Sequence, residues 1–214
     1  MANYDAIADV SESVLTLLRE SITARSDVVS VDRSDIALAS PTDVTSESDV
    51  RLALYLYDLS QNSTLSNADR RTVDTNTRRD PPLALDVRYL LTAYPHGTDD
   101  GDTTSETLSQ QRLLGLAMQV LYDNAVLDAD QLQGSLGETD LKISLESASL
   151  DQLTGLWSTF SDTPYQPSAS YHVRPVLIDS QHEEEIARVS EQQTGVSRKP
   201  ENSSFGSKKE RERR

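Results

Sequence analysis

Histidines and clustered carboxylates are the residues of this sequence that could bind a metal or exchange protons. His96 follows a Tyr-Pro pair, His172 lies in an alternating apolar run, and His182 precedes three glutamates. Zinc sites draw His and Cys ligands together from ordered elements, whereas these histidines are widely spaced and the chain has no cysteine. We therefore predict no metal site and expect the histidines to be solvent-facing polar residues.

A short acidic cluster could in principle hold a divalent cation through its carboxylate oxygens. Asp99, Asp100 and Asp102 follow one another closely, but they lack the alternating spacing and the terminal glutamate of the EF-hand calcium loop. We interpret the cluster as a solvated acidic loop.

Sequence templates for catalysis are missing from the chain. It contains no glycine-rich dinucleotide fingerprint, no phosphate loop, no His-Glu-x-x-His motif and no Gly-x-Ser-x-Gly motif. A hydrolase built from scattered Asp and His residues would need a pocket with strongly perturbed titrating groups, and no pattern in the sequence indicates one. We predict a protein that is not an enzyme and has no catalytic residues and no cofactor.

Arginine is concentrated in one polar segment between two apolar runs. Residues 60–82 hold Arg70, Arg71, Arg78 and Arg79 and end in a Pro-Pro pair. In a chain with a net charge of -15, this cluster could supply complementary charge at a contact with another subunit. A solvated loop explains the same residues equally well, so both interpretations stay open.

The negative charge lies in residues 1–180, where arginine supplies nearly all of the positive charge. Acidic surfaces that are poor in lysine suit proteins working in molar salt, where counter-ions screen self-repulsion. We predict a halophilic source, and an acidic protein from a low-salt organism is the alternative. Because nucleic-acid binding needs a basic face, we expect no nucleic-acid partner.

Membrane and export signals are also missing. The first residues lack the basic and apolar regions of a signal peptide, and no apolar run approaches the roughly 20 residues that span a bilayer. We expect no membrane partner and a protein that stays in the cytoplasm until a larger assembly carries it out.

Two hydrophobic periods predict the secondary structure. Apolar residues recur at three- and four-residue steps from Tyr4 to Ile22 and again after Thr103, which predicts amphipathic helices. Alternation over residues 50–57, 83–92 and 141–145 predicts strands with one strongly apolar face.

Capping signals and a proline refine these boundaries. Thr103 with Glu106, and Ser149 with Gln152, match capping boxes at two helix starts. The helix that starts at Ser149 should bury Trp157 and Phe160 as core residues.

A last strand is predicted at residues 171–178. Pro175 marks it as an edge or bulged strand, because proline cannot donate to a sheet ladder.

The order of these elements predicts the fold class and the domains. Helix, strands, helix, strand, helix and strand indicate an α/β (α+β) fold with a mixed central β-sheet flanked by helices. We expect one domain over residues 1–180. Residues 181–214 are polar and charged, with few aromatic or branched residues, and we expect a flexible tail.

Several segments, taken together, resemble a known protein family. The most specific are the Pro-Pro-Leu-Ala-Leu stretch that continues to the Thr-Ala-Tyr of residues 92–94, and the helix that ends in Leu-Trp. The full set comprises residues 5–10, 54–57, 81–94, 113–118, 150–157 and 165–171. This combination resembles the tail-terminator (cap) proteins of phage-tail-like extracellular contractile injection systems over about residues 1–180.

The resemblance implies a tail-terminator-like fold and a structural function. Family members form a homohexameric ring at the baseplate-distal end of the particle, where the ring ends the inner tube and anchors the last sheath ring. The implied partners are further copies of the chain, the sheath protein and the inner tube protein. The implied location is a particle assembled in the cytoplasm and released extracellularly in some systems.

Candidate contact residues follow from the arginine cluster, the last strand and the tail. They are Arg70, Arg71, Arg78, Arg79, Tyr171, Arg174 and Arg188. A further hypothesis is that the strand at residues 171–178 and the tail add a strand to a neighbour's sheet. The alternative function is a soluble adaptor that binds one partner without forming a ring.

Overall fold

The computed structural model describes residues 3–25, 27–45, 48–65, 71–72, 77–96, 102–136 and 140–185, and for residues 71–72 it describes the backbone alone. Within these ranges the helices are α1 (Ala6–Thr23), α2 (Thr103–Asp123), α3 (Leu150–Trp157) and the short 3-10 helix η1 (Arg33–Asp35). The strands are β1 (Ile36–Leu38), β2 (Leu52–Gln61), β3 (Arg71–Thr72), β4 (Thr77–Arg79), β5 (Leu83–Ala93), β6 (Val126–Leu127), β7 (Leu141–Leu145), β8 (Ser168–Ile178) and β9 (Glu183–Glu185).

The strands form two sheets of unequal size. The larger sheet has the order β1-β2-β5-β8-β7-β6, in which β1 pairs parallel with β2 and all other pairs are antiparallel. The smaller antiparallel sheet has the order β3-β4-β9. The mixed central sheet predicted from the sequence is therefore confirmed.

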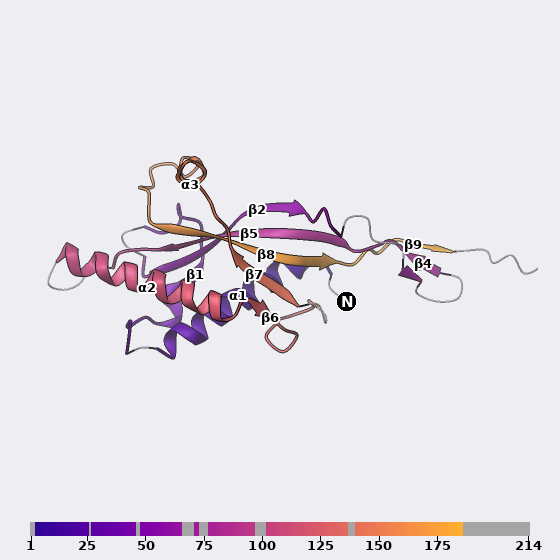
Figure 1. Ribbon diagram of the computed structural model, residues 1–214, viewed down its shortest axis with the longest axis horizontal. Helices are drawn as coiled ribbons and strands as arrows, with labels where there is room; N and C mark the ends of the chain where they lie inside the picture. The colour runs from indigo at the N-terminus through magenta and orange to yellow at the C-terminus, as the bar shows by residue number, and fades with distance from the viewer. Residues whose placement is uncertain are drawn as a thin grey trace, which may run out of the picture.

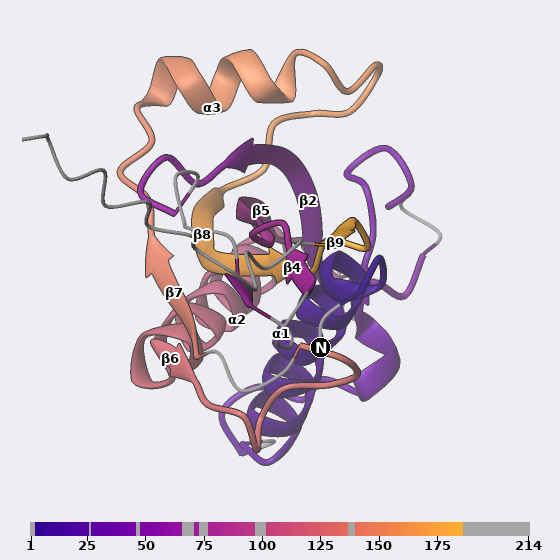
Figure 2. The same cartoon turned by 90° about the vertical axis from the view of Figure 1, so that its right-hand side faces the viewer.

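Helices cover the two faces of the larger sheet unequally. The sheet curls around α1 and α2 on one face, and α3 lies across the other face (Figure 2). The long strands β2, β5 and β8 run beyond these helices and lead to the smaller sheet at one end of the elongated molecule (Figure 1). We refer to the part covered by helices as the body.

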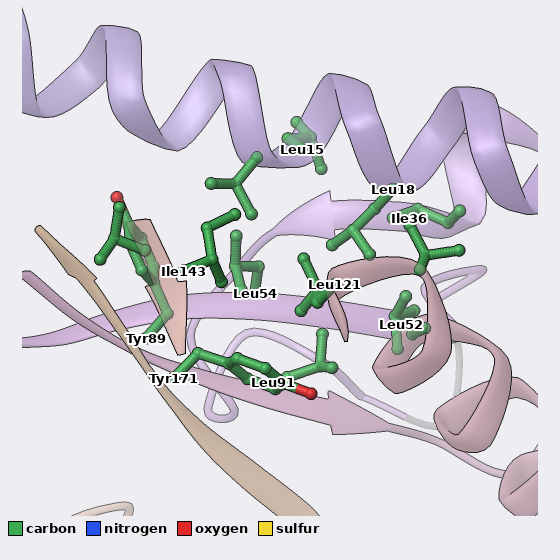
Figure 3. Packing of buried hydrophobic residues seen from close by; sticks show 14 of the residues in the cluster. Leu15, Leu18, Ile36, Leu52, Leu54, Tyr89, Leu91, Leu121, Ile143 and Tyr171 are labelled. Atoms are coloured by element: carbon green, nitrogen blue, oxygen red, sulfur yellow. The ribbon is translucent and has the colours of Figure 1, made fainter. Parts of the chain in front are cut away.

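The main hydrophobic core lies between α1, α2 and the concave face of the sheet (Figure 3). Leu18 of α1 is 0% exposed and packs in the same cluster as Leu54 and Leu91 of the sheet. Strand residues two apart point to the same face, so the alternating leucines of β2 all reach this core. A smaller cluster of Leu90, Trp157 and Phe160 lies under α3, as expected for the two aromatic residues.

Helix starts follow from side-chain caps. Ser149 and Gln152 form the predicted capping box at the start of α3. At α2 the prediction was wrong by one residue, because Asp102 and not Thr103 is the N-cap. The Asp102 carboxylate accepts hydrogen bonds from the backbone amides of Thr104 (3.1 Å) and Ser105 (3.3 Å), and a carboxylate at this position also favours the helix dipole.

The position of β8 corrects a second prediction. β8 lies inside the sheet between β5 and β7, so it is not an edge strand. Leu85 pairs with Val176 and Val87 pairs with Val173, which leaves both Arg174 and Pro175 opposite Asp86. The proline is tolerated in this interior strand because it occupies a bulge, where the ladder is already interrupted. The bulge was the correct half of the prediction.

The loop that contains Gly134 and Ser135 packs closely against α1. Gly134 has φ +68°, and a Cβ atom there would lie 2.2 Å from the Asp9 carboxylate. The same carboxylate accepts hydrogen bonds from the backbone amide (2.7 Å) and the hydroxyl (2.9 Å) of Ser135. The close approach of this loop to α1 therefore requires glycine.

The polar segment at residues 60–82 leaves the larger sheet, as expected, and the structure places β3 and β4 within it. The predicted tail begins with an ordered strand, since Glu183–Glu185 forms β9. Residues 186–214, and the carboxylates of Asp99 and Asp100, lie outside the described residues. The division into a domain and a flexible tail stays a prediction.

Candidate functional site

The described arginines of the cluster lie on the smaller sheet, which projects from the body (Figure 1). We define the arm as β3, β4 and β9 together with Leu83 at the start of β5, Ile178 at the end of β8, and Leu59, two residues before the end of β2. Arg78 and Arg79 belong to β4, and Arg71 starts β3. Arg70 lies outside the described residues, and the side chain of Arg71 is not among the described ones.

The arm pairs its arginines with glutamates of the same chain. Arg79 stands opposite Glu183 in the β4–β9 ladder, and the two side chains form an ion pair, with Nε donating to Oε1 at 3.1 Å. Arg78 stands opposite Glu184. Sequence analysis considered a subunit contact or a solvated loop, and it missed this intrachain arrangement. The run of three glutamates was the signal that could have found it.

A second contact joins the base of β4 to the segment before β9. Asp80 Oδ2 lies 3.0 Å from His182 Nδ1, and the Asp80 backbone amide donates to the His182 carbonyl at 3.2 Å. The histidine was expected to face solvent, and its side chain is indeed 69% exposed. These contacts hold the arm together through charge and backbone pairing.

The other predicted contact residues lie in different environments. Tyr171 is 4% exposed and packs in the main core, where burial raises the pKa of its hydroxyl to about 12. Arg174 is exposed on β8, and its ladder partner on β7 is Lys142, which is also exposed. Arg188 lies outside the described residues.

A polar network covers the convex face of the sheet beside α3. Glu146 accepts hydrogen bonds from the Ser170 hydroxyl (2.9 Å), from Tyr57 (3.3 Å) and from Arg88 Nε (3.2 Å). Arg88 also forms an ion pair with Asp58. The network therefore joins β2, β5 and β8 to the segment that follows β7.

The charges of this network shift the pKa values of its members. Burial by itself raises the pKa of Glu146. The Ser170 hydroxyl and the Arg88 guanidinium together lower it by more than burial raises it, so the pKa lies below its usual value. Burial raises the pKa of Tyr57, with a smaller contribution from the Glu146 charge, and the hydrogen bond to Ser170 opposes both. The network thus keeps Glu146 ionised and Tyr57 protonated at neutral pH, which suits a structural ion pair.

The histidines do not come together as ligands. His172 Nε2 lies 3.3 Å from Asp86 Oδ2 across the β5–β8 bulge, and Asn62 Nδ2 donates to the other oxygen of Asp86 at 2.7 Å. His96 lies in the segment after β5. Among the described residues, no group of three or more His, Cys, Asp or Glu side chains could hold a metal ion. No described helix is long and apolar enough to cross a bilayer.

An apolar groove of about 580 Å³ opens between α2 and the β7 edge of the sheet. Met118, Leu121 and Tyr122 of α2 form one wall, and Leu145 and Lys142 of β7 form the other. Tyr122 is 83% exposed and Leu145 is 56% exposed. Sequence analysis missed this groove, because a periodic pattern does not show which apolar side chains a neighbouring element leaves uncovered.

The fold of this chain is similar to that of solved terminator and cap proteins. One similar solved structure is the sheath/tube terminator of PVC, an extracellular contractile injection system, in its extended state. The two share 20% sequence identity and a TM-score of 0.56, covering 94% of this chain and 65% of that chain. Another is the tube-terminating cap of the anti-feeding prophage AFP, with 20% identity and a TM-score of 0.54, covering 88% of this chain and 61% of that chain.

This chain thus spans less than two thirds of the length of each of these structures. At 20% identity the similarity establishes the fold, and the expected terminator-like fold is confirmed. A search of curated proteins finds no match. The model of the Pvc16 N-terminal domain family matches residues 9–192, which is most of the sequence, and the chain therefore belongs to this family.

Proposed function

We propose that this protein is the structural cap of a contractile injection system or phage-like tail, where it forms a ring that ends the inner tube and anchors the last sheath ring. The observation that carries this proposal is the family match over residues 9–192, together with the shared fold of a sheath/tube terminator and a tube-terminating cap.

The arrangement of the chain supports a ring. A closed ring needs heterologous contacts, in which one surface of a subunit meets a different surface of the next. This molecule has two unlike surfaces of that kind, a projecting arm and an apolar groove on the body. The proposed ring is a homohexamer, and its further partners are the sheath protein and the inner tube protein.

The polar side chains support a function without catalysis. Arg88 forms ion pairs with Asp58 of the neighbouring strand and with Glu146, and Asp86 accepts a hydrogen bond from Asn62 and lies 3.3 Å from His172. These contacts join neighbouring strands. We infer that the protein acts through shape and contact.

Deletion of the gene tests the capping function. If the protein ends the tube, particles from the deletion strain should be abnormally long or ragged at the baseplate-distal end when imaged by electron microscopy. Re-expression of the chain should restore uniform particles. Particles of normal length and normal ends in the deletion strain would contradict the proposal.

The oligomeric mass separates the cap from an adaptor that binds a single partner. Light scattering of the purified chain in concentrated salt should give a mass near that of six chains. Screening by salt reduces repulsion between these acidic subunits, so the mass should fall as salt is removed. A mass of one chain at every salt concentration would contradict the ring.

A further inference from the structure

The arm presents apolar side chains that no helix of its own subunit covers. Leu59 and Leu83 are each 45% exposed. Leu59 pairs with Val87, and Leu83 lies two residues before Leu85, so both continue the face that forms the main core in the body. α1 and α2 lie beside the body, and β5 and β8 continue from there toward the smaller sheet (Figure 1).

The smaller sheet adds no hydrophobic core of its own. All three residues of β9 are exposed, and none of the described side chains of β4 is buried. Short strands without a packed face are marginal in water, so this sheet gains stability when another surface covers it. β9 lies at the edge of the sheet, and Glu185 makes no ion pair with the described residues.

The body carries a surface of matching chemistry. The groove between α2 and β7 is lined almost wholly by apolar atoms, and Lys142 stands at its rim. Lys142 and Arg174 are opposite each other on β7 and β8, and neither forms an ion pair with the described residues. Like charges placed directly opposite in a sheet repel, and an external carboxylate would relieve this repulsion.

The edge of β7 is also only partly covered. β6 pairs with Leu141 and Lys142, and the Ile143 amide donates to the Ala125 carbonyl at 2.8 Å. Beyond this point Leu145 lines the groove, and none of the described strands pairs with it on that edge. An extended segment can lie along this edge, since unpaired backbone groups favour added strands.

We propose that the arm of one copy of this chain binds the groove between α2 and β7 of the next copy. In this contact Leu59 and Leu83 enter the apolar groove, and Glu185 of β9 faces Lys142 and Arg174. The contact joins two different surfaces, so it repeats head to tail and closes into a ring. The inference rests on the proposed ring and names the surfaces that form it.

The first test reverses the charge of Lys142, which lines the groove, and of its ladder partner Arg174. Lys142→Glu combined with Arg174→Glu should weaken self-association about 100-fold or more at the lowest salt concentration at which the unmodified chain assembles, because carboxylates would then face carboxylates. Arg33→Glu combined with Arg112→Glu changes the net charge equally at exposed positions outside the groove lining, and it should leave association close to that of the unmodified chain. Sedimentation across a concentration series measures both, and circular dichroism checks that each variant is folded.

The second test uses the polarity of a head-to-tail contact. An arm variant, Leu59→Ser with Leu83→Ser and Glu185→Gln, should fail to assemble by itself, as should the groove variant. Mixed together, the two still possess one intact arm and one intact groove, so they should form a dimer and nothing larger. A contact between subunits that does not join the arm to the groove would give either no complex or full rings in the mixture.

The outcomes separate this inference from the proposed function. An unmodified chain that is monomeric in every salt overturns both the ring and the contact. An unmodified chain that assembles, with a folded groove variant that assembles equally well, overturns the contact alone and leaves the ring. A dimer in the mixture supports the contact.

Discussion

The body and the arm of this molecule are built on different physical principles. In the body, helices cover both faces of a curled sheet, and side chains such as Leu18 and Leu91 are completely buried. In the arm, strand pairing and the ion pair of Arg79 with Glu183 hold β4 and β9 together, and none of the described side chains of these two strands is buried. Because burial of apolar surface is the dominant stabilising term, the body folds by itself and the arm is completed by contact.

The largest predicted effect is the loss of a core leucine. Leu18→Ala should lower the free energy of unfolding by about 2–5 kcal/mol, because it leaves a cavity at a position that is 0% exposed. Leu59→Ala in the arm, at 45% exposure, should change it by less than about 0.5 kcal/mol in the isolated subunit. Urea denaturation measures both. Equal losses at the two positions would contradict the division into a cored body and an uncored arm.

The next effect concerns the loop that packs on α1. Gly134→Ala should lower the free energy of unfolding by about 2 kcal/mol or more, because the residue has φ +68° and the new Cβ atom would displace the Asp9 carboxylate from Ser135. Gly115 provides the control, since nothing lies within 4 Å of its added Cβ. Gly115→Ala on α2 should stabilise the protein by about 0.5–1 kcal/mol, as alanine is the better helix former. Thermal unfolding measures the stabilities of Gly134→Ala, the unmodified protein and Gly115→Ala, which should increase in that order.

The sequence predicted the body well because its signals are local. The alternation of residues 83–92 and the Ser149–Gln152 capping box each depend on a few neighbouring residues, and both appear in the structure as β5 and the start of α3. The predicted start of α2 was wrong by one residue, because Asp102 and not Thr103 occupies the N-cap position. Local patterns therefore fix the elements and leave their ends uncertain by about one residue.

Long-range pairing lies beyond such patterns. Pro175 suggested an edge or a bulged strand, and the sequence did not decide between them. β8 is flanked by β5 and β7, and the register between β5 and β8 shows that the proline occupies a bulge. The pairing of Arg78 and Arg79 with Glu184 and Glu183 joins residues about a hundred positions apart. Each charged run looks solvated by itself, because its partner is visible only once the chain has folded.

A smaller effect on the free energy of unfolding is expected from the ion pair of Glu146 with Arg88 in the body. Glu146→Gln removes the charge that faces Arg88 and should lower the free energy of unfolding by about 1 kcal/mol at neutral pH. The folded-state pKa of Glu146 is lowered, so its contribution is complete above the ordinary glutamate pKa of about 4.3 and is lost as the pH falls toward the folded value.

Glu146→Gln and the unmodified protein should therefore have the same stability once the pH is below the folded-state pKa of Glu146. Urea titrations at a series of pH values measure the convergence, and Glu12→Gln at an exposed position of α1 serves as the control. A difference that persists unchanged in acid would show that the network depends on the shape of the side chain and not on its charge.

The smallest effect on stability belongs to the arm. Arg79→Ala removes the ion pair with Glu183, and exposed pairs contribute at most about 1 kcal/mol, less in high salt. In the isolated subunit the change should leave global unfolding almost unaltered while amide hydrogens of β4 and β9 exchange faster, because the arm opens locally without unfolding the body. Arg33→Ala, at an exposed site in η1, should change neither. Hydrogen exchange followed by mass spectrometry resolves the two regions. If the body lost protection together with β4 and β9, the arm would be part of the cooperative core, and the contrast between the two regions would fail.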